Sequence, residues 1–156
     1  MAPKGQPGNL IRTRLAEESG KLMVVEDQIR KRLMRLADIC LSFPGSTRED
    51  ESRHSTFRVG KKIFAYYLKD HDRDQIISVC CRVLEGDNLR LVQSNPRKFY
   101  LPPYIGARGW VGFRLDLPAL DWTEVNNLVS GSFTQTAPKK FLKLLRDSRP
   151  TAGKIS

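Results

Sequence analysis

The sequence predicts a single α+β domain, in which one amphipathic helix precedes an antiparallel meander of strands and further helices follow. Three observations predict it. Apolar residues recur at intervals of three and four over residues 25–41, they alternate over residues 55–83, and helical spacing returns after Asp121. The chain has 156 residues, 40% hydrophobic and 28% charged, which is ordinary for one globular domain.

The first element is a helix over residues 25–41. Its apolar stripe consists of residues three and four apart: Ile29, Leu33, Leu36, Ala37 and Cys40. Glu26 and Asp27 lie in the first turn, where the helix dipole favours negative charge. Pro44 disfavours helical geometry at the residue before it, so Phe43-Pro44-Gly45 is expected to end the helix.

An antiparallel meander is expected next. Gly60-Lys61 is typical of a hairpin tip between two strands, and a charged loop over residues 69–74 separates the second strand from a third. The expected strands share period-two alternation or an enrichment in aromatic and β-branched residues: 55–59, 62–68 and 75–83, with an edge strand over 47–52 as a further candidate.

The second half returns to helices. Asp121 with Glu124 three residues later is close to a capping box and predicts a helix start. Alternation predicts that Trp110 and Arg114 face one side of a strand and Phe113 the other. The expected elements are a short helix over 86–94, a strand over 109–115, the helix after Asp121 and a last helix over 138–147, with a loop over 95–108.

Around this domain, residues 1–24 are expected to form a flexible or partly helical arm, the domain spans residues 25–147, and residues 148–156 form a tail. No apolar run could span a bilayer, and the N-terminal residues lack the apolar segment of a signal peptide. The three cysteines do not have the spacing of a disulfide framework, which would be typical of a small secreted protein. We therefore expect a soluble cytoplasmic protein. The sequence does not indicate which oligomeric state the protein adopts.

Charge is the unusual bulk property. The chain has 27 Lys and Arg against 17 Asp and Glu, a formal net charge of +10, and its pI is about 9.9. Such a domain attracts polyanions, which suits nucleic acid or anionic lipid. The alternative is a generally positive, soluble surface that carries no site.

Basic and aromatic residues concentrate in two places. One is the first hairpin and the other is the loop before the strand at 109–115, where Phe99, Tyr100 and Tyr104 lie between cations. Cations beside aromatic rings can contact phosphates and stack on bases. The predicted nucleic-acid-binding residues are Arg53, Arg58, Lys61, Lys62, Arg97, Lys98 and Arg108. The alternative is that the aromatic residues fill the core and the cations are dispersed.

Motifs for catalysis, metals or cofactors are absent from the sequence. His54 and His71 lack zinc-ligand spacing, and no nucleophile elbow or phosphate-binding glycine loop occurs. Glu49 and Glu51 are interpreted as a solvated acidic edge. The cysteines, Cys40, Cys80 and Cys81, are interpreted as small hydrophobic residues, with Cys80 and Cys81 on opposite faces of a strand. We therefore predict no catalytic residue, no metal and no cofactor.

Three segments, in order, resemble the MmcQ/YjbR family: residues 40–49 (CLSFPGSTRE), 57–65 (FRVGKKIFA) and 103–111 (PYIGARGWV). The helix after Asp121, ending in Gly131-Ser132-Phe133, is similar to the last helix common to that family. The resemblance implies a frataxin-like two-layer sandwich, with an antiparallel sheet and helices packed on one face. It also implies that hairpins act as wings in DNA binding.

A frataxin-like fold raises the question of iron, which such proteins bind through an acidic first helix. Here the acidic Glu26, Asp27 and Asp38 are outnumbered on that helix by the basic residues Arg30, Lys31, Arg32 and Arg35. A basic ridge repels a hard cation, so the sequence argues against iron binding.

The leading hypothesis from the sequence is a non-enzymatic DNA-binding protein that contacts the phosphate backbone through basic hairpin wings. The alternative is a protein- or small-ligand-binding domain with an aromatic pocket around Glu49, Tyr104 and Trp110. An enzyme is the third and least favoured interpretation, since no recognisable motif supports it.

Overall fold

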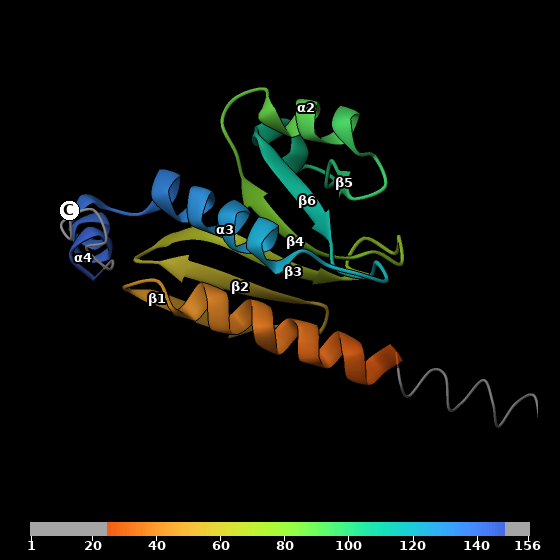
Figure 1. The fold of residues 1–156 in the computed structure, drawn as a ribbon, viewed down its shortest axis with the longest axis horizontal. Helices are drawn as coiled ribbons and strands as arrows, with labels where there is room; N and C mark the ends of the chain where they lie inside the picture. The colour runs from red at the N-terminus through yellow and green to blue at the C-terminus, as the bar shows by residue number, and fades with distance from the viewer. Residues whose placement is uncertain (1–24, 149–156) are drawn as a thin grey trace, which may run out of the picture. The chain divides into compact units, whose positions relative to one another are not determined.

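The computed structural model describes residues 25–148, which form helices and a β-sheet (Figure 1). A helix over residues 25–41 comes first. The following elements are β1 (Ser46–Asp50), β2 (His54–Val59), β3 (Lys62–Lys69), β4 (Ile77–Arg82), α2 (Asp87–Ser94), β5 (Phe99–Tyr100), the 3-10 helix η1 (Ile105–Arg108), β6 (Trp110–Arg114), α3 (Trp122–Thr136) and α4 (Lys139–Ser148). The arm expected over 1–24 and all but the first residue of the expected tail lie outside the described residues.

The chain divides into two units between Met34 and Arg35, inside the first helix, and each unit is considered by itself. In the first unit, Asp27 pairs with Arg30 and Lys31, three and four residues further along the helix. These cations lower the pKa of Asp27, the Lys31 hydrogen bond most of all. Such exposed ion pairs add little stability.

The second unit contains a six-stranded antiparallel sheet in the order β1-β2-β3-β4-β6-β5. The predicted meander is confirmed, including the edge strand β1 and the hairpin whose tip is Gly60-Lys61. Gly60 has a φ of 61°, a conformation that glycine adopts without steric cost and that a hairpin tip requires. The α+β fold class predicted from the sequence is therefore correct.

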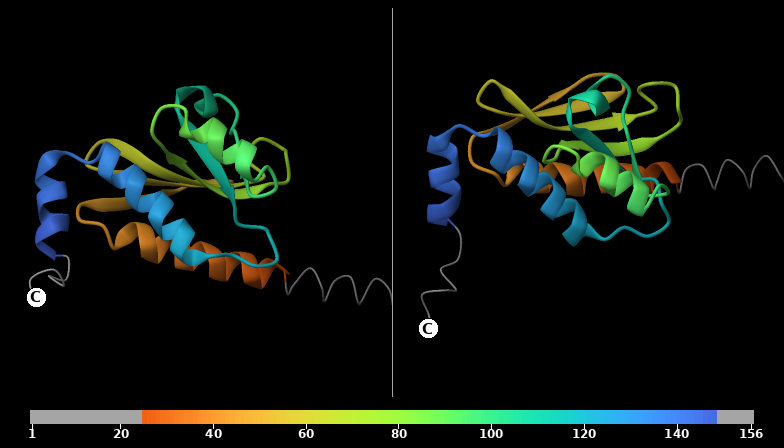
Figure 2. Two further views of the ribbon diagram at one scale, coloured as in Figure 1. Left: turned by 45° about the horizontal axis from the view of Figure 1, so that its top comes forward. Right: turned by 90° about the horizontal axis from the view of Figure 1, so that it is seen from above.

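Helix α3 lies across one face of this sheet, as two further views show (Figure 2). Asp121 caps the helix by accepting hydrogen bonds from the backbone N–H groups of Thr123 and Glu124, as the sequence predicts. Phe133 of α3 stacks on Phe43 at 4.8 Å and meets Phe64 edge to face at 5.3 Å between ring centroids. These rings form the centre of the core between helix and sheet.

A β-bulge and a serine join α3 to the sheet. Phe57 pairs with Ala65 and Arg58 with Ile63, so Phe64 has no partner across the ladder. The buried Ser132 hydroxyl donates to the Phe64 carbonyl at 2.6 Å and accepts from the backbone N–H of Arg82 at 2.9 Å. One side chain therefore satisfies two backbone groups that the strands leave unpaired.

The other sheet face carries a smaller cluster of Leu68, Cys80 and Trp110, with Tyr66 and Ile105 packed against it. Cys81 and Val111 alternate with these residues along β4 and β6 and so point to the α3 face. Cys80 and Cys81 lie on opposite faces, as predicted.

Three sequence predictions of element bounds need correction. Helix α3 does not end at residues 131–133 but continues to Thr136, because Ser132, Phe133 and Thr136 are all buried against the sheet. The expected loop over 95–108 contains β5, which pairs with β6, and η1. Strand β4 begins at Ile77 rather than residue 75, since Gln75 has a φ of 61°, which no regular strand accommodates.

Candidate nucleic-acid interface

Helix α4 is more strongly amphipathic than α2 and α3. Phe141, Leu142, Leu144 and Leu145 lie on one side of it. Lys139, Lys143 and Arg146 recur at the i, i+4 and i+7 positions of the opposite side, and Lys140 flanks them. None of the ten residues of α4 is buried, so its cations are open to solvent.

Phe141 brings α4 to the tip of the β2–β3 hairpin. A Cβ atom on Gly45 would lie 2.3 Å from Phe141 Cε1, and one on Gly60 would lie 3.9 Å from Phe141 Cε2. The ring therefore fills the space between the turn at Gly45, whose φ is 74°, and the hairpin tip. Figure 1 shows the same arrangement, with α4 at the end of the sheet where β2 turns into β3.

These two elements form what we call the basic surface, which consists of Lys61, Lys62, Lys139, Lys140, Lys143 and Arg146. All six residues are open to solvent. None forms an ion pair with another residue of the described chain, whereas the strand residues Arg48, Arg58 and Arg114 do. Asp147 is the carboxylate of the same helix. Six uncompensated cations on neighbouring elements make a field that attracts polyanions.

The hairpin residues predicted from the sequence divide into two groups. Lys61 and Lys62 belong to the basic surface. Arg58 is paired with Glu49 at 3.5 Å. Arg53 lies before the opposite end of β2, about 20 Å from the tip at about 3.3 Å per strand residue, and contacts Asp70 at 3.8 Å. The structure therefore separates Arg53 from the wing to which the sequence assigns it.

The second predicted group, Arg97, Lys98 and Arg108, does not form one cluster with its aromatic neighbours. Lys98 is half-buried and pairs with Glu124 of α3 at 2.8 Å. Arg97 is exposed before β5. Arg108 ends η1 and borders, with Arg82, an open concavity of about 790 Å³.

The aromatic residues of that loop explain why it does not form a stacking platform. Phe99 is buried and meets Phe113 edge to face, with 5.4 Å between ring centroids. The Tyr100 hydroxyl shares a hydrogen bond of 2.6 Å with Ser78 across the sheet. Only Tyr104 of the three is exposed, at 90%. The alternative from the sequence, that Phe99, Tyr104 and Trp110 fill the core, is confirmed for Phe99 and Trp110 and is wrong for Tyr104.

The pocket predicted around Glu49, Tyr104 and Trp110 is not formed by those three residues together. Trp110 is 6% exposed and packs under Tyr66, with 5.3 Å between ring centroids. Glu49 lies on β1, in register two strands away from Tyr66, and pairs with Arg58. Tyr104 borders a concavity that neither Glu49 nor Trp110 lines. The long-range packing of Trp110 explains the difference, because its ring is used in the core.

The thiols are all buried. Burial raises the pKa of Cys80 to about 12, against 9.0 for an ordinary thiol, and raises the pKa values of Cys40 and Cys81 as well. Within residues 25–148, no three His, Cys, Asp or Glu side chains converge as metal ligands would. In the same part of the chain, no helix has the length and apolar character needed to cross a membrane.

We expect the three thiols to be nearly inert in the native protein. At pH 8, raising a thiol pKa from 9.0 to about 12 lowers its thiolate fraction about a thousandfold. Reaction with an aromatic disulfide reagent should therefore be slow in buffer and should release three equivalents promptly in denaturant. Prompt reaction of even one thiol in the folded protein would contradict this burial.

The sequence interpretation missed the cations of α4. It recognised the last helix by Phe141, Leu142, Leu144 and Leu145 but did not consider the lysines on the other side. The signal was present, because Lys139, Lys143 and Arg146 follow helical spacing. What the sequence could not reveal is that α4 lies beside the hairpin tip.

Comparisons with known proteins agree with the fold. Residues 41–135, more than half of the 156, match the family model described as YjbR. The crystal structure of Deinococcus radiodurans protein DR2400, with a DUF419 domain, is similar with a TM-score of 0.54. The two are 20% identical, over 65% of this chain and 75% of that chain, so the likeness bears on fold alone. No curated protein matches the chain.

Proposed function

Because this chain belongs to the YjbR family, for which the sequence resemblance implies DNA binding, we propose that it is a non-enzymatic protein that binds duplex DNA through the basic surface. In this proposal the hairpin tip, with Lys61 and Lys62, acts as a wing at the phosphate backbone. Helix α4 contributes the other cations. The proposal keeps the wing expected from the sequence and adds a second element to it.

One observation carries the proposal: six cations gather on two neighbouring elements and none has a carboxylate partner within the described chain. A cation already paired with a carboxylate gains less from a phosphate than one that is only hydrated. Arg53, Arg58 and Lys98, which are paired, therefore contribute less in this proposal than the sequence suggested.

The proposed binding is tolerant of sequence. Lysines act as point charges and suit phosphate oxygens, whereas base reading depends on bidentate groups placed in a groove. Five of the six cations of the basic surface are lysines. We therefore expect affinity from the backbone, with small differences between duplexes of different sequence.

A salt titration tests the proposal. Fluorescence anisotropy of a labelled 20-base-pair duplex should detect binding at micromolar protein in 50 mM salt. With up to six phosphate contacts, log K should fall against log salt with a slope of about −3 to −5, at about −0.9 for each phosphate engaged. Absence of binding under these conditions, or a slope near zero, would overturn the proposal, and equal affinity for duplex RNA would widen it to nucleic acid in general.

A further inference from the structure

A second concavity lies away from the basic surface, where β3 ends. Its volume is about 210 Å³, below the range typical of sites for drug-sized ligands, so a single small group would fill it. Tyr66 and Leu68 of β3 line it. Lys62 of the basic surface lies at the opposite end of β3, six residues before Leu68. At about 3.3 Å per strand residue, the concavity is therefore about 20 Å from Lys62.

Four rings border this concavity, which we call the ring pocket: His54, Tyr66, His71 and Tyr104. The rings of His54 and His71 meet edge to face, with 5.0 Å between their centroids. The Tyr66 ring packs against Trp110, which does not itself line the concavity. Tyr104 stands at the rim with 90% of its surface exposed. The ring faces come from four separate segments that only the tertiary fold brings together.

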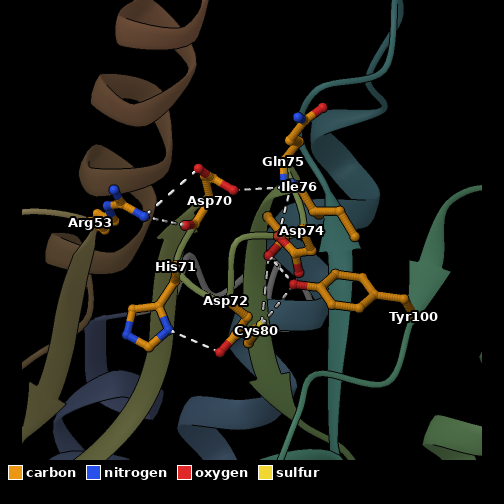
Figure 3. A network of polar contacts seen from close by, with 10 residues as sticks. Arg53, Asp70, His71, Asp72, Asp74, Gln75, Ile76, Cys80 and Tyr100 are labelled. Atoms are coloured by element: carbon orange, nitrogen blue, oxygen red, sulfur yellow. Dashed lines mark hydrogen bonds and ion pairs between the residues drawn. The ribbon is translucent and has the colours of Figure 1, made fainter.

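The loop between β3 and β4 holds His71 and Asp72 in place (Figure 3). The Asp70 carboxylate accepts from the backbone N–H of Gln75 at 2.7 Å, and Arg53 donates to the Asp70 carbonyl at 3.3 Å. His71 and Asp72 are themselves 3.4 Å apart, from Nδ1 to Oδ1. The figure shows the contacts of Asp70 with Arg53 and with Gln75, which fix the loop from which the His71 and Asp72 side chains project.

The ring pocket has an acidic residue in its wall, although the chain as a whole is positively charged. The whole sequence has a net charge of +10, yet no Lys or Arg of the described residues lines this concavity. Asp72 is the carboxylate of its wall, and Glu51 approaches His54 to 3.9 Å. A positive ligand therefore meets aromatic rings and the Asp72 carboxylate here, with no Lys or Arg among the lining residues.

Tyr104 has a second unusual property. Its φ is 67° and its ψ is −58°, a backbone conformation that costs energy for any residue other than glycine. The two prolines before it and the backbone of η1 hold it there, since Ile105 donates its N–H to the Pro103 carbonyl at 2.8 Å. An exposed ring kept in a strained backbone position at the edge of a concavity is suited to cover a bound group.

We propose that the ring pocket binds an alkylated ammonium group, either on a small free cation or on a methylated lysine side chain. The faces of Tyr66 and Tyr104 attract such cations through the ring quadrupole, and aromatic cages are the arrangement that recognises quaternary ammonium ions. The imidazole rings of His54 and His71 add ring surface, and the Asp72 carboxylate adds opposite charge. The inference is independent of DNA binding, because it uses no residue of the basic surface.

The test uses the full chain and three probes at constant ionic strength. Choline supplies the free cation, a short peptide containing trimethyllysine supplies the side chain, and 3,3-dimethylbutan-1-ol supplies the same shape as choline without charge. NMR chemical shifts and calorimetry should show saturable millimolar binding of at least one cation. The neutral alcohol should bind at least about fivefold more weakly than choline. Tighter binding of the peptide than of choline would identify a protein partner as the source of the group, and the reverse would identify a free cation.

Variants decide whether the binding is at this place. Tyr104→Ala should weaken binding about fivefold, and because Tyr104 is exposed the variant should fold normally. Tyr104→Phe, which keeps the ring face, should bind like the native chain, and Asp72→Asn should bind more weakly than it. Absence of saturable binding by both cations, equal binding of the neutral alcohol, or an unchanged affinity in Tyr104→Ala would overturn the proposal. None of these results depends on whether the protein binds DNA.

Discussion

Lys139→Glu combined with Lys143→Glu should lower the affinity for duplex DNA roughly 50-fold or more at 0.1 M salt. Each phosphate that the protein no longer neutralises removes about 0.9 from the salt slope, which at 0.1 M salt corresponds to roughly eightfold in affinity, and reversed charges add repulsion. The slope should fall by about two. Lys61→Glu with Lys62→Glu should produce a change of the same size, measured by anisotropy.

The matched control is Lys69→Glu combined with Arg73→Glu. Both residues are exposed, Lys69 at the end of β3 away from Lys62 and Arg73 in the loop after it. The control variant therefore has the same net charge as the α4 variant but leaves the basic surface unchanged. If this control weakens binding as much as the α4 variant does, total charge rather than a local surface governs binding, and the proposed interface is wrong.

A further variant, Phe141→Ala, keeps every charge but removes the ring that contacts the turn at Gly45. It should weaken DNA binding, because α4 is then no longer packed beside the hairpin tip.

Ser132→Ala should destabilise the protein by about 2–4 kcal/mol. Its hydroxyl serves the Phe64 carbonyl and the Arg82 N–H, and both groups would be left without a partner in a buried place. The denaturant midpoint should fall without a change in the dependence on denaturant, and the melting temperature should fall by roughly 5–15 °C.

Thr134→Ala is the control for this experiment. It lies on the same helix, but its hydroxyl donates to the Ser130 carbonyl of the helix itself at 2.8 Å and is exposed. Its effect should be within about 0.5 kcal/mol. Equal destabilisation by the two variants would mean that Ser132 stabilises α3 only as a helix residue, without the link to the bulge.

The parts of the fold that the sequence predicted correctly are those specified by neighbouring residues. The hairpin tip depends on Gly60 and on alternation to either side of it, and the start of α3 depends on Asp121 and the N–H groups two and three residues later. Ordered segments over residues 40–111 were enough to identify the family. The bounds that failed, such as the end of α3, depend on burial against a sheet formed elsewhere in the chain.

The candidate interface shows the same division. Composition alone established the net charge of +10, and the helical spacing of three α4 cations was present in the sequence but was not used in its interpretation. Neither could reveal which cations are compensated, because Arg53 pairs with a residue 17 positions away and Lys98 with one 26 positions away. Pairing acts over a few ångströms of space, and only the folded chain determines which charges come within that distance.

The sequence by itself therefore determined an α+β protein of this family, with strong positive charge and with the β2–β3 hairpin tip and the start of α3 set by local residues. Tertiary structure decided the rest. It used Phe99, Tyr100 and Trp110 in packing, left Tyr104 exposed, and brought α4 to the hairpin tip through the ring of Phe141. The physical reason is that turns and caps are satisfied within a few residues, whereas burial and ion pairing depend on contacts between distant segments.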